Sequence, residues 1–233
     1  MSFSINDAWT ETVADLKVHA GRYLLPAAAF LFFPTLVVEV LTPPLVDLKT
    51  DLIDPALTGP RAFASIAAIP GYLAIIAIAL GITGHEGPAI RRGLTLFPAA
   101  LGVTILTGLA TMAGLTLLIL PGLFLFARFF VALPALADGE TRVLDAIRTS
   151  WEATEGRWAP ILGGALLLII GATFAGAVAG LIGALIGGTT PEGAPPSLPA
   201  ALAQTGMGAV AGTLITVFQA KVWRELQANR LPG

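Results

Sequence analysis

The stretch GLTLFPAALGVTILTGLATMAGLTLLILPGLFLFARFFVALPALA, residues Gly93–Ala137, decides the fold class. It runs for 45 residues with Arg128 as its only charged side chain. A helix needs about 20 apolar residues to cross the hydrocarbon core of a membrane, so this length fits two spans and a tight turn. Pro121 predicts the start of the second span, because the first turn of a helix tolerates a residue without an N–H. The stretch therefore predicts a helical hairpin inside a membrane.

The rest of the chain has the same character. Of its 233 residues, 55% are apolar and only 12% are charged, whereas a soluble domain carries about 25% charged residues. This deficit indicates that lipid is the main solvent of the folded chain. We predict one all-α integral membrane domain over residues 1–233 with six transmembrane helices. The expected spans are residues 23–41, 62–84, 94–117, 119–137, 158–183 and 199–221.

The basic residues predict the orientation of these spans. Ten of the thirteen Lys and Arg residues fall in alternate segments, and the opposite segments hold only Lys49 and Arg61. The ten are Lys17, Arg22, Arg91, Arg92, Arg142, Arg148, Arg157, Lys221, Arg224 and Arg230. Cytoplasmic loops carry the excess of Lys and Arg, so we expect both termini in the cytoplasm and the chain in the cytoplasmic (inner) membrane.

Two segments outside the spans, residues 5–20 and 141–155, are predicted to be amphipathic helices on the cytoplasmic surface. In the second, Leu144, Ile147 and Trp151 recur at helical spacing, with charged residues on the opposite face. Both carry as much acid as base, which is atypical of helices that bind strongly to a lipid surface.

A faint internal repeat accompanies this pattern. Ile69–Gly71 resembles Leu120–Gly122, and Ala89–Arg91 resembles Ala146–Arg148. One interpretation is a threefold repeat of a surface helix followed by two spans.

Arg128 and Glu39 are the candidate ligand-binding residues. A bare Arg in the hydrocarbon core costs at least about 2.5–3.5 kcal/mol, so Arg128 should face protein or water. Counted along straight helices, both residues fall in the outer half of the membrane. We therefore predict a Glu39–Arg128 ion pair that closes the first span against the fourth. The structural interpretation is a clamp, and the functional one is an anion or headgroup site at Arg128.

Small residues at helical spacing predict close packing of the last two spans. Glycines that recur every three or four residues let helix backbones approach each other inside lipid. The candidates are Gly176, Gly180, Gly183 and Gly187 in the fifth span and Gly208 and Gly212 in the sixth. The alternative is a pore-lining or oligomer-forming face.

Signatures of catalysis are missing from the sequence. His85-Glu86 resembles the start of a zinc protease motif, but position 89 is Ala where that motif needs a second histidine. The chain has no cysteine, and the predicted spans contain no Asp. We expect no enzyme activity, no metal and no cofactor. The net charge of −2 also provides no basic field for nucleic acid.

One part of the chain resembles known bacterial proteins. The run Leu120–Arg128 places Pro-Gly before a helix with an embedded Arg, and Ala146–Glu152 with Gly156–Trp158 follows as a surface helix and glycine stop. This pattern is similar to the membrane domain attached to some glycerophosphodiester phosphodiesterases and to stand-alone YciC-type inner-membrane proteins. The surface helix here lacks one basic residue of their pattern, and the resemblance covers about residues 85–165. No counterpart of the phosphodiesterase catalytic domain is present, so the resemblance implies no activity.

Two function classes follow. The first is a non-catalytic scaffold or accessory module in envelope or lipid homeostasis. Its expected partners are membrane lipids and either another membrane or envelope protein or a second copy of the chain. The alternative is a transporter or channel for a small anion, solute or lipid that uses Arg128.

Overall fold

The computed structural model describes residues 4–43, 46–47, 52–53, 55–140, 142–188, 190 and 194–229. Lys49, Thr141 and Arg230, which entered the sequence predictions, lie outside these residues. The elements are α1 (Ile5–Pro26), the π-helix η1 (Ala27–Phe32), α2 (Phe33–Leu41), β1 (Val46–Asp47), β2 (Leu52–Ile53), α3 (Pro55–Ala79), α4 (Glu86–Leu117), α5 (Ile119–Phe129), α6 (Ala132–Asp138), α7 (Val143–Ala153), α8 (Trp158–Gly187) and α9 (Leu198–Ala228).

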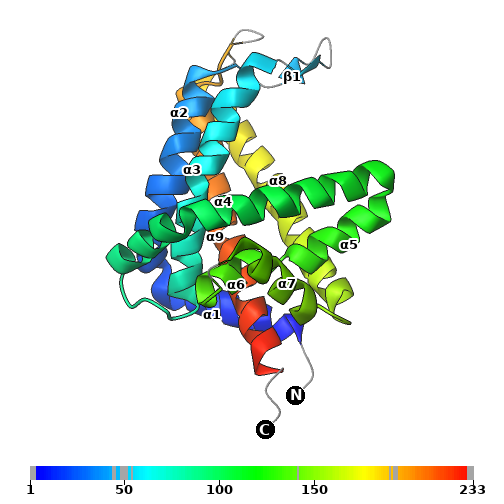
Figure 1. The fold of residues 1–233 in the computed structure, drawn as a ribbon. Coiled ribbons are helices and arrows are strands. Elements are labelled where there is room, and N and C mark those ends of the chain that lie inside the picture. The colour runs from blue at the N-terminus through cyan, green and yellow to red at the C-terminus, as the bar shows by residue number, and fades with distance from the viewer. Residues whose placement is uncertain are drawn as a thin grey trace.

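The predicted six-span all-α fold is confirmed. Within the described residues, six helical segments are long and apolar enough to cross a membrane. Strand structure there is limited to an antiparallel pairing of β1 with β2, two residues each, between α2 and α3. The start of α1 and the end of α9 lie at one end of the molecule together with α6 and α7, and the end of α2 lies at the other (Figure 1).

The first span differs from its prediction because no break separates a surface helix from it. Residues 5–41 form one helical segment made of α1, η1 and α2. Pro26 lacks the N–H that would continue the helical ladder, and the π-helix follows it directly. In this wider turn the N–H of Phe33 bonds to the carbonyl of Ala28, five residues back.

The fourth span is broken into α5 and α6 at Phe130–Val131. A proline ring clashes with the carbonyl four residues earlier, so Pro134 could not continue a helix that ran through Phe130. The break places Pro134 in the first turn of α6, where it is tolerated.

Other boundaries shift for similar local reasons. The third span starts at Glu86 rather than at residue 94, because Pro88 falls in the first turn of α4. The second span ends at Ala79, where Gly81 adopts a positive φ of 74° and the N–H of Ile82 bonds to the carbonyl of Ala77. Only α7 forms a surface helix separate from the spans among the described residues, so the threefold repeat stays a prediction.

The core is built around α3, whose segment Leu73–Ala79 is almost fully buried among α4, α6 and α9. A second cluster, around Phe130 and Phe218, joins α1, α6, α7, α8 and α9, and Phe126 of α5 packs against it. By contrast, α4 and α8 expose most of their length, and the α4–α5 hairpin extends to one side of the α2–α3 pair (Figure 1). Such long apolar exposure requires a lipid surrounding.

Candidate functional site

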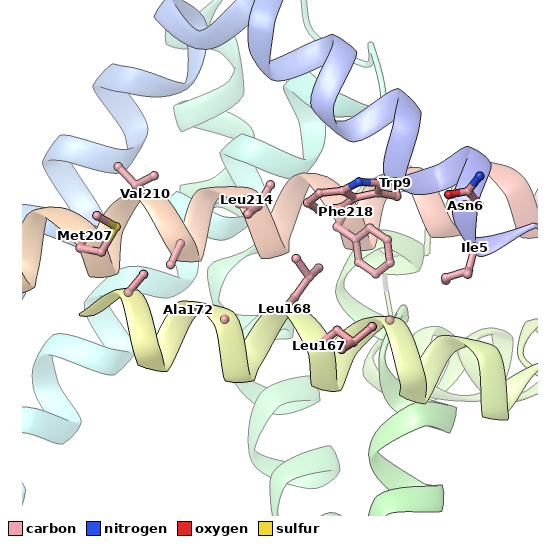
Figure 2. Close-up of a pocket in the computed structure, with 14 residues that line it drawn as sticks. Ile5, Asn6, Trp9, Leu167, Leu168, Ala172, Met207, Val210, Leu214 and Phe218 are labelled. Atoms are coloured by element: carbon pink, nitrogen blue, oxygen red, sulfur yellow. The ribbon is translucent and has the colours of Figure 1, made fainter. Parts of the chain in front are cut away.

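A groove of about 570 Å³ between α8 and α9 is lined almost entirely by apolar residues, and the start of α1 closes one end of it (Figure 2). From α8 it is lined by Gly164, Leu167, Leu168, Gly171, Ala172 and Ala175, from α9 by Met207, Val210, Ala211, Leu214 and Phe218, and from α1 by Ile5, Asn6 and Trp9. Its size is that of small-molecule sites, which run from about 300 to 1,000 Å³.

The two ends of the groove differ chemically. At the α1 end, Asn6 and Trp9 supply the polar atoms, and the ring of Trp9 meets that of Phe218 edge-on with centroids 6.5 Å apart. At the other end, Met207, Val210 and Ala172 give the groove an apolar lining (Figure 2). The groove thus has one end suited to a membrane interface, where Trp and Asn can stay wet, and one suited to hydrocarbon.

Contacts at predicted glycines hold α8 on α9 beyond the aliphatic end. A Cβ at Gly183 would lie 2.6 Å from the Cα of Ala200, and one at Gly180 would lie 3.3 Å from the Oε1 of Gln204. A Cβ at Gly187 would meet Ser197. These three glycines let the backbones approach closely, as the spacing predicts.

The remaining predicted glycines lie elsewhere. A Cβ at Gly212 would lie 3.1 Å from Leu31, so this glycine faces η1 rather than α8. Added Cβ atoms at Gly176 and Gly208 would meet nothing within 4 Å. The closest backbone contact outside the α8–α9 pair was missed: at Gly93, a Cβ would run into the carbonyl of Pro70 on α3.

Arg128 lies at the end of α5 against the surface helix α7. Its guanidinium stacks 4.3 Å from the ring centroid of Trp151 and 5.7 Å from that of Phe124, and its side chain is buried. The helix break leaves its carbonyl free, and the hydroxyls of Ser150 and Thr154 donate to it at 2.8 and 3.3 Å. Arg128 therefore joins α5 to α7.

The predicted Glu39–Arg128 ion pair is not formed, although the structure describes both residues. Glu39 lines a separate cavity, together with Arg61, near the end of α2. The prediction counted depth along straight spans from an assumed boundary. The break after Arg128 and the docking of α7 instead place this residue at the end of the molecule where α7 lies (Figure 1).

A buried polar cluster joins α1 to α9, and sequence reasoning missed it. The ammonium group of Lys221 lies 2.5 Å from Asp15 Oδ2 and donates to the carbonyl of Ala79 at 3.0 Å. His19 Nδ1 lies 2.7 Å from Asp15 Oδ1, and the hydroxyl of Tyr23 donates to Asp15 at 3.1 Å. The spacing of Asp15, His19 and Tyr23 at steps of four was a signal that could have found one side of the cluster.

The same end of the molecule holds further contacts between charged side chains and helix ends. Arg92 donates to the carbonyl of Ala137 at 2.7 and 3.2 Å, and the indole of Trp223 donates to Asp138 at 2.9 Å. Within the described ranges, no group of three or more His, Cys, Asp or Glu residues is placed to hold a metal ion. The Arg92 contacts satisfy the Ala137 carbonyl near the end of α6, and the contacts of Arg92 and Trp223 together fix α4 and α9 to α6.

Comparison with known proteins identifies the family but no activity. No curated protein and no solved structure matches the chain. The likeness to glycerophosphodiester phosphodiesterase membrane domains and YciC-type proteins stays a hypothesis. A family model described as "Domain of unknown function (DUF7847)" matches residues 6–225. Since this match spans nearly the whole sequence, the chain belongs to the DUF7847 family.

Proposed function

We propose that this protein is a non-catalytic membrane module that holds one acyl chain of a membrane lipid in the α8–α9 groove and serves lipid homeostasis of the cell envelope. The groove itself is the observation that carries the proposal. Its lining residues are all uncharged, and α8 exposes many apolar side chains, which supports contact of the groove with bilayer lipid.

The length of the groove supports an acyl chain as its occupant. From Gly164 to Ala175 the helix rises about 16 Å at 1.5 Å per residue, close to half of the hydrocarbon thickness of about 30 Å. A chain from one leaflet would therefore fill it. Its ester and headgroup region would meet Asn6 and Trp9, which can remain hydrated.

The proposed setting is the cytoplasmic membrane of a bacterium, with both termini inside. The distribution of Lys and Arg supports this orientation. It puts α7 and the α1 end of the groove at the cytoplasmic surface. The occupant would then come from the inner leaflet.

A carrier that uses Arg128 as its binding charge has less support. The guanidinium of Arg128 is stacked on Trp151 and Phe124, and its backbone carbonyl is held by Ser150 and Thr154. This arrangement is typical of a structural joint between two helices.

A glycine pair on α8 gives a matched test. Gly171 lines the groove and Gly163 does not, yet an added Cβ at either position meets nothing within 4 Å. Native mass spectrometry of protein released from mild detergent would compare wild type, Gly171→Leu and Gly163→Leu.

We expect a bound phospholipid on wild type and on Gly163→Leu, and at least a tenfold lower occupancy on Gly171→Leu with an unchanged melting temperature. Equal lipid occupancy in the two variants would exclude the groove as the lipid site. A dimer that dissociates only in Gly171→Leu would show that the groove receives a second copy instead.

A further inference from the structure

A second cavity, of about 420 Å³, lies among η1, α2, α3 and α9 and shares no lining residue with the groove. Unlike the groove, it is lined by polar side chains from several helices. They are Thr35 and Glu39 from α2, Arg61, Ser65 and Tyr72 from α3, and Gln204 and Thr205 from α9. Neither the glycine pattern nor the family match assigns a role to it.

Two groups in this cavity lack partners among the residues that the structure describes. Thr205 is 4% exposed, and its hydroxyl has no hydrogen-bond partner there. The carboxylate of Glu39 has no hydrogen bond or ion pair to any residue that the structure describes. Buried polar groups in native proteins are nearly always satisfied, so the unpartnered hydroxyl of Thr205, in a cavity that the half-buried Glu39 also lines, points to a bound polar molecule.

Arg61 supplies a positive charge in the same cavity. Its Nη2 donates to the carbonyl of Pro43 at 2.8 Å and its Nη1 to that of Leu57 at 3.4 Å, which fixes the guanidinium between the end of α2 and the start of α3. A guanidinium has five N–H donors, so further donors remain beyond these two contacts. Arg61 and Glu39 form no direct ion pair within 4.0 Å, although both are described and both line the cavity.

We propose that this cavity binds a small zwitterion, with its ammonium group at Glu39 and Thr205 and its anionic group at Arg61. The cavity offers one negative and one positive side chain, so a ligand with both charges leaves neither uncompensated. Gln204 and Tyr72 line the same cavity, and their side chains can accept or donate hydrogen bonds. The same chemistry occurs in a free ammonium–oxyanion solute and in a zwitterionic lipid headgroup.

The two sources can be separated with two probes. O-phosphoethanolamine tests the free solute, and its affinity for the full-length protein in detergent is measured by isothermal titration calorimetry. Nanodiscs of phosphatidylethanolamine or of phosphatidylglycerol test the headgroup, with the retained lipid measured by native mass spectrometry.

The variants remove proposed ligand contacts but leave Arg61 and its hydrogen bonds to the carbonyls of Pro43 and Leu57 unchanged. Glu39→Gln keeps the side-chain shape and removes the charge, and Thr205→Val keeps the volume and removes the hydroxyl. Glu11→Gln, at an exposed position of α1, is the matched control. Melting temperatures within about 2 °C of wild type establish that each variant is folded.

We expect at least a tenfold loss of affinity or retained lipid in Glu39→Gln, a threefold or greater loss in Thr205→Val and no change in Glu11→Gln. Calorimetric binding assigns the site to a solute. Selective retention of phosphatidylethanolamine that is lost in Glu39→Gln assigns it to a headgroup. Failure of both probes to bind wild type, or equal binding by wild type and Glu39→Gln, would overturn the proposal. Because Gly171→Leu leaves this cavity intact, its outcome tests the groove separately.

Discussion

Replacing Lys221 by methionine removes the charged group that connects three helices. The ammonium of Lys221 on α9 contacts Asp15 on α1 at 2.5 Å and the carbonyl of Ala79 at the end of α3 at 3.0 Å. The side chain of Lys221 is 6% exposed and that of Asp15 is 13% exposed. Methionine matches the length of lysine but offers no donor. Among the described residues, Asp15 would then keep its buried charge with His19 and Tyr23 as its remaining side-chain partners.

The magnitude follows from this burial. Removing one partner of a buried ion pair costs about 3–5 kcal/mol, because the other charge is left uncompensated. For a domain of this size, each kcal/mol lowers the melting temperature by about 2–4 °C. We therefore expect Lys221→Met to melt about 6–20 °C below wild type. Asp15→Asn together with Lys221→Met removes both charges, so the double variant should fall short of the summed single losses by about 0.5–3 kcal/mol.

The assay is thermal unfolding in detergent, followed by tryptophan fluorescence. Lys17→Met is the control, because Lys17 is exposed on the same helix as Asp15, and its loss should change stability by no more than about 0.5 kcal/mol. A Lys221→Met shift no larger than that of Lys17→Met would refute the reasoning. So would a double variant whose loss equals the sum of the single losses.

Three further measurements test the packing and the orientation. Gly93→Ala should lower the free energy of unfolding by about 1–3 kcal/mol, since its Cβ would meet the Pro70 carbonyl. Gly108→Ala on the same helix has open space around its Cβ and should melt no lower than wild type, so equal melting temperatures of the two variants would contradict the close contact. Arg128→Lys keeps the charge but loses the planar stacking on Trp151, so it should lower the free energy of unfolding by about 0.5–2 kcal/mol. Arg91→Lys, at an exposed position, should leave stability unchanged, and an equally unchanged Arg128→Lys would contradict the stacking. The chain has no cysteine, so single cysteines that replace His85 and Ala194 report on which side of the membrane each position lies. In intact cells a membrane-impermeant maleimide should label Ala194→Cys and should label His85→Cys only after lysis. The reverse pattern would place both termini outside.

The spans could be predicted from sequence because their signal is strong and local. A run of 45 residues with one charge has few physical alternatives to a membrane hairpin. The interruptions within the helical spans were harder to predict. Pro26 and Pro134 both disturb a helix, but Pro26 is absorbed by a π-turn in a continuous segment whereas Pro134 begins a new helix. Which response follows depends on neighbouring residues. At the break between α5 and α6, the hydroxyls of Ser150 and Thr154 satisfy the free carbonyl of Arg128.

The candidate site was predictable only in part. The small-residue spacing indicated contacts of Gly180, Gly183 and Gly187 with α9, because close helix packing follows from periodicity. The partners of Arg128 and Glu39 were not predictable from their positions along the spans. Rise per residue gives depth along a helix, but not which helix is its neighbour, and Arg61 rather than Arg128 shares the cavity with Glu39.

The contact between Lys221 and Ala79 also bears on the order in which the molecule assembles. Its two residues are 142 positions apart, and synthesis at about 5–20 residues per second separates them by about 7–28 s. During that interval the end of α3 and the carboxylate of Asp15 are already made, while the lysine that joins them is not. Water at the membrane surface, or an insertion factor, has to satisfy these groups until α9 arrives. The last helix therefore completes the polar contacts of the first and of the end of α3.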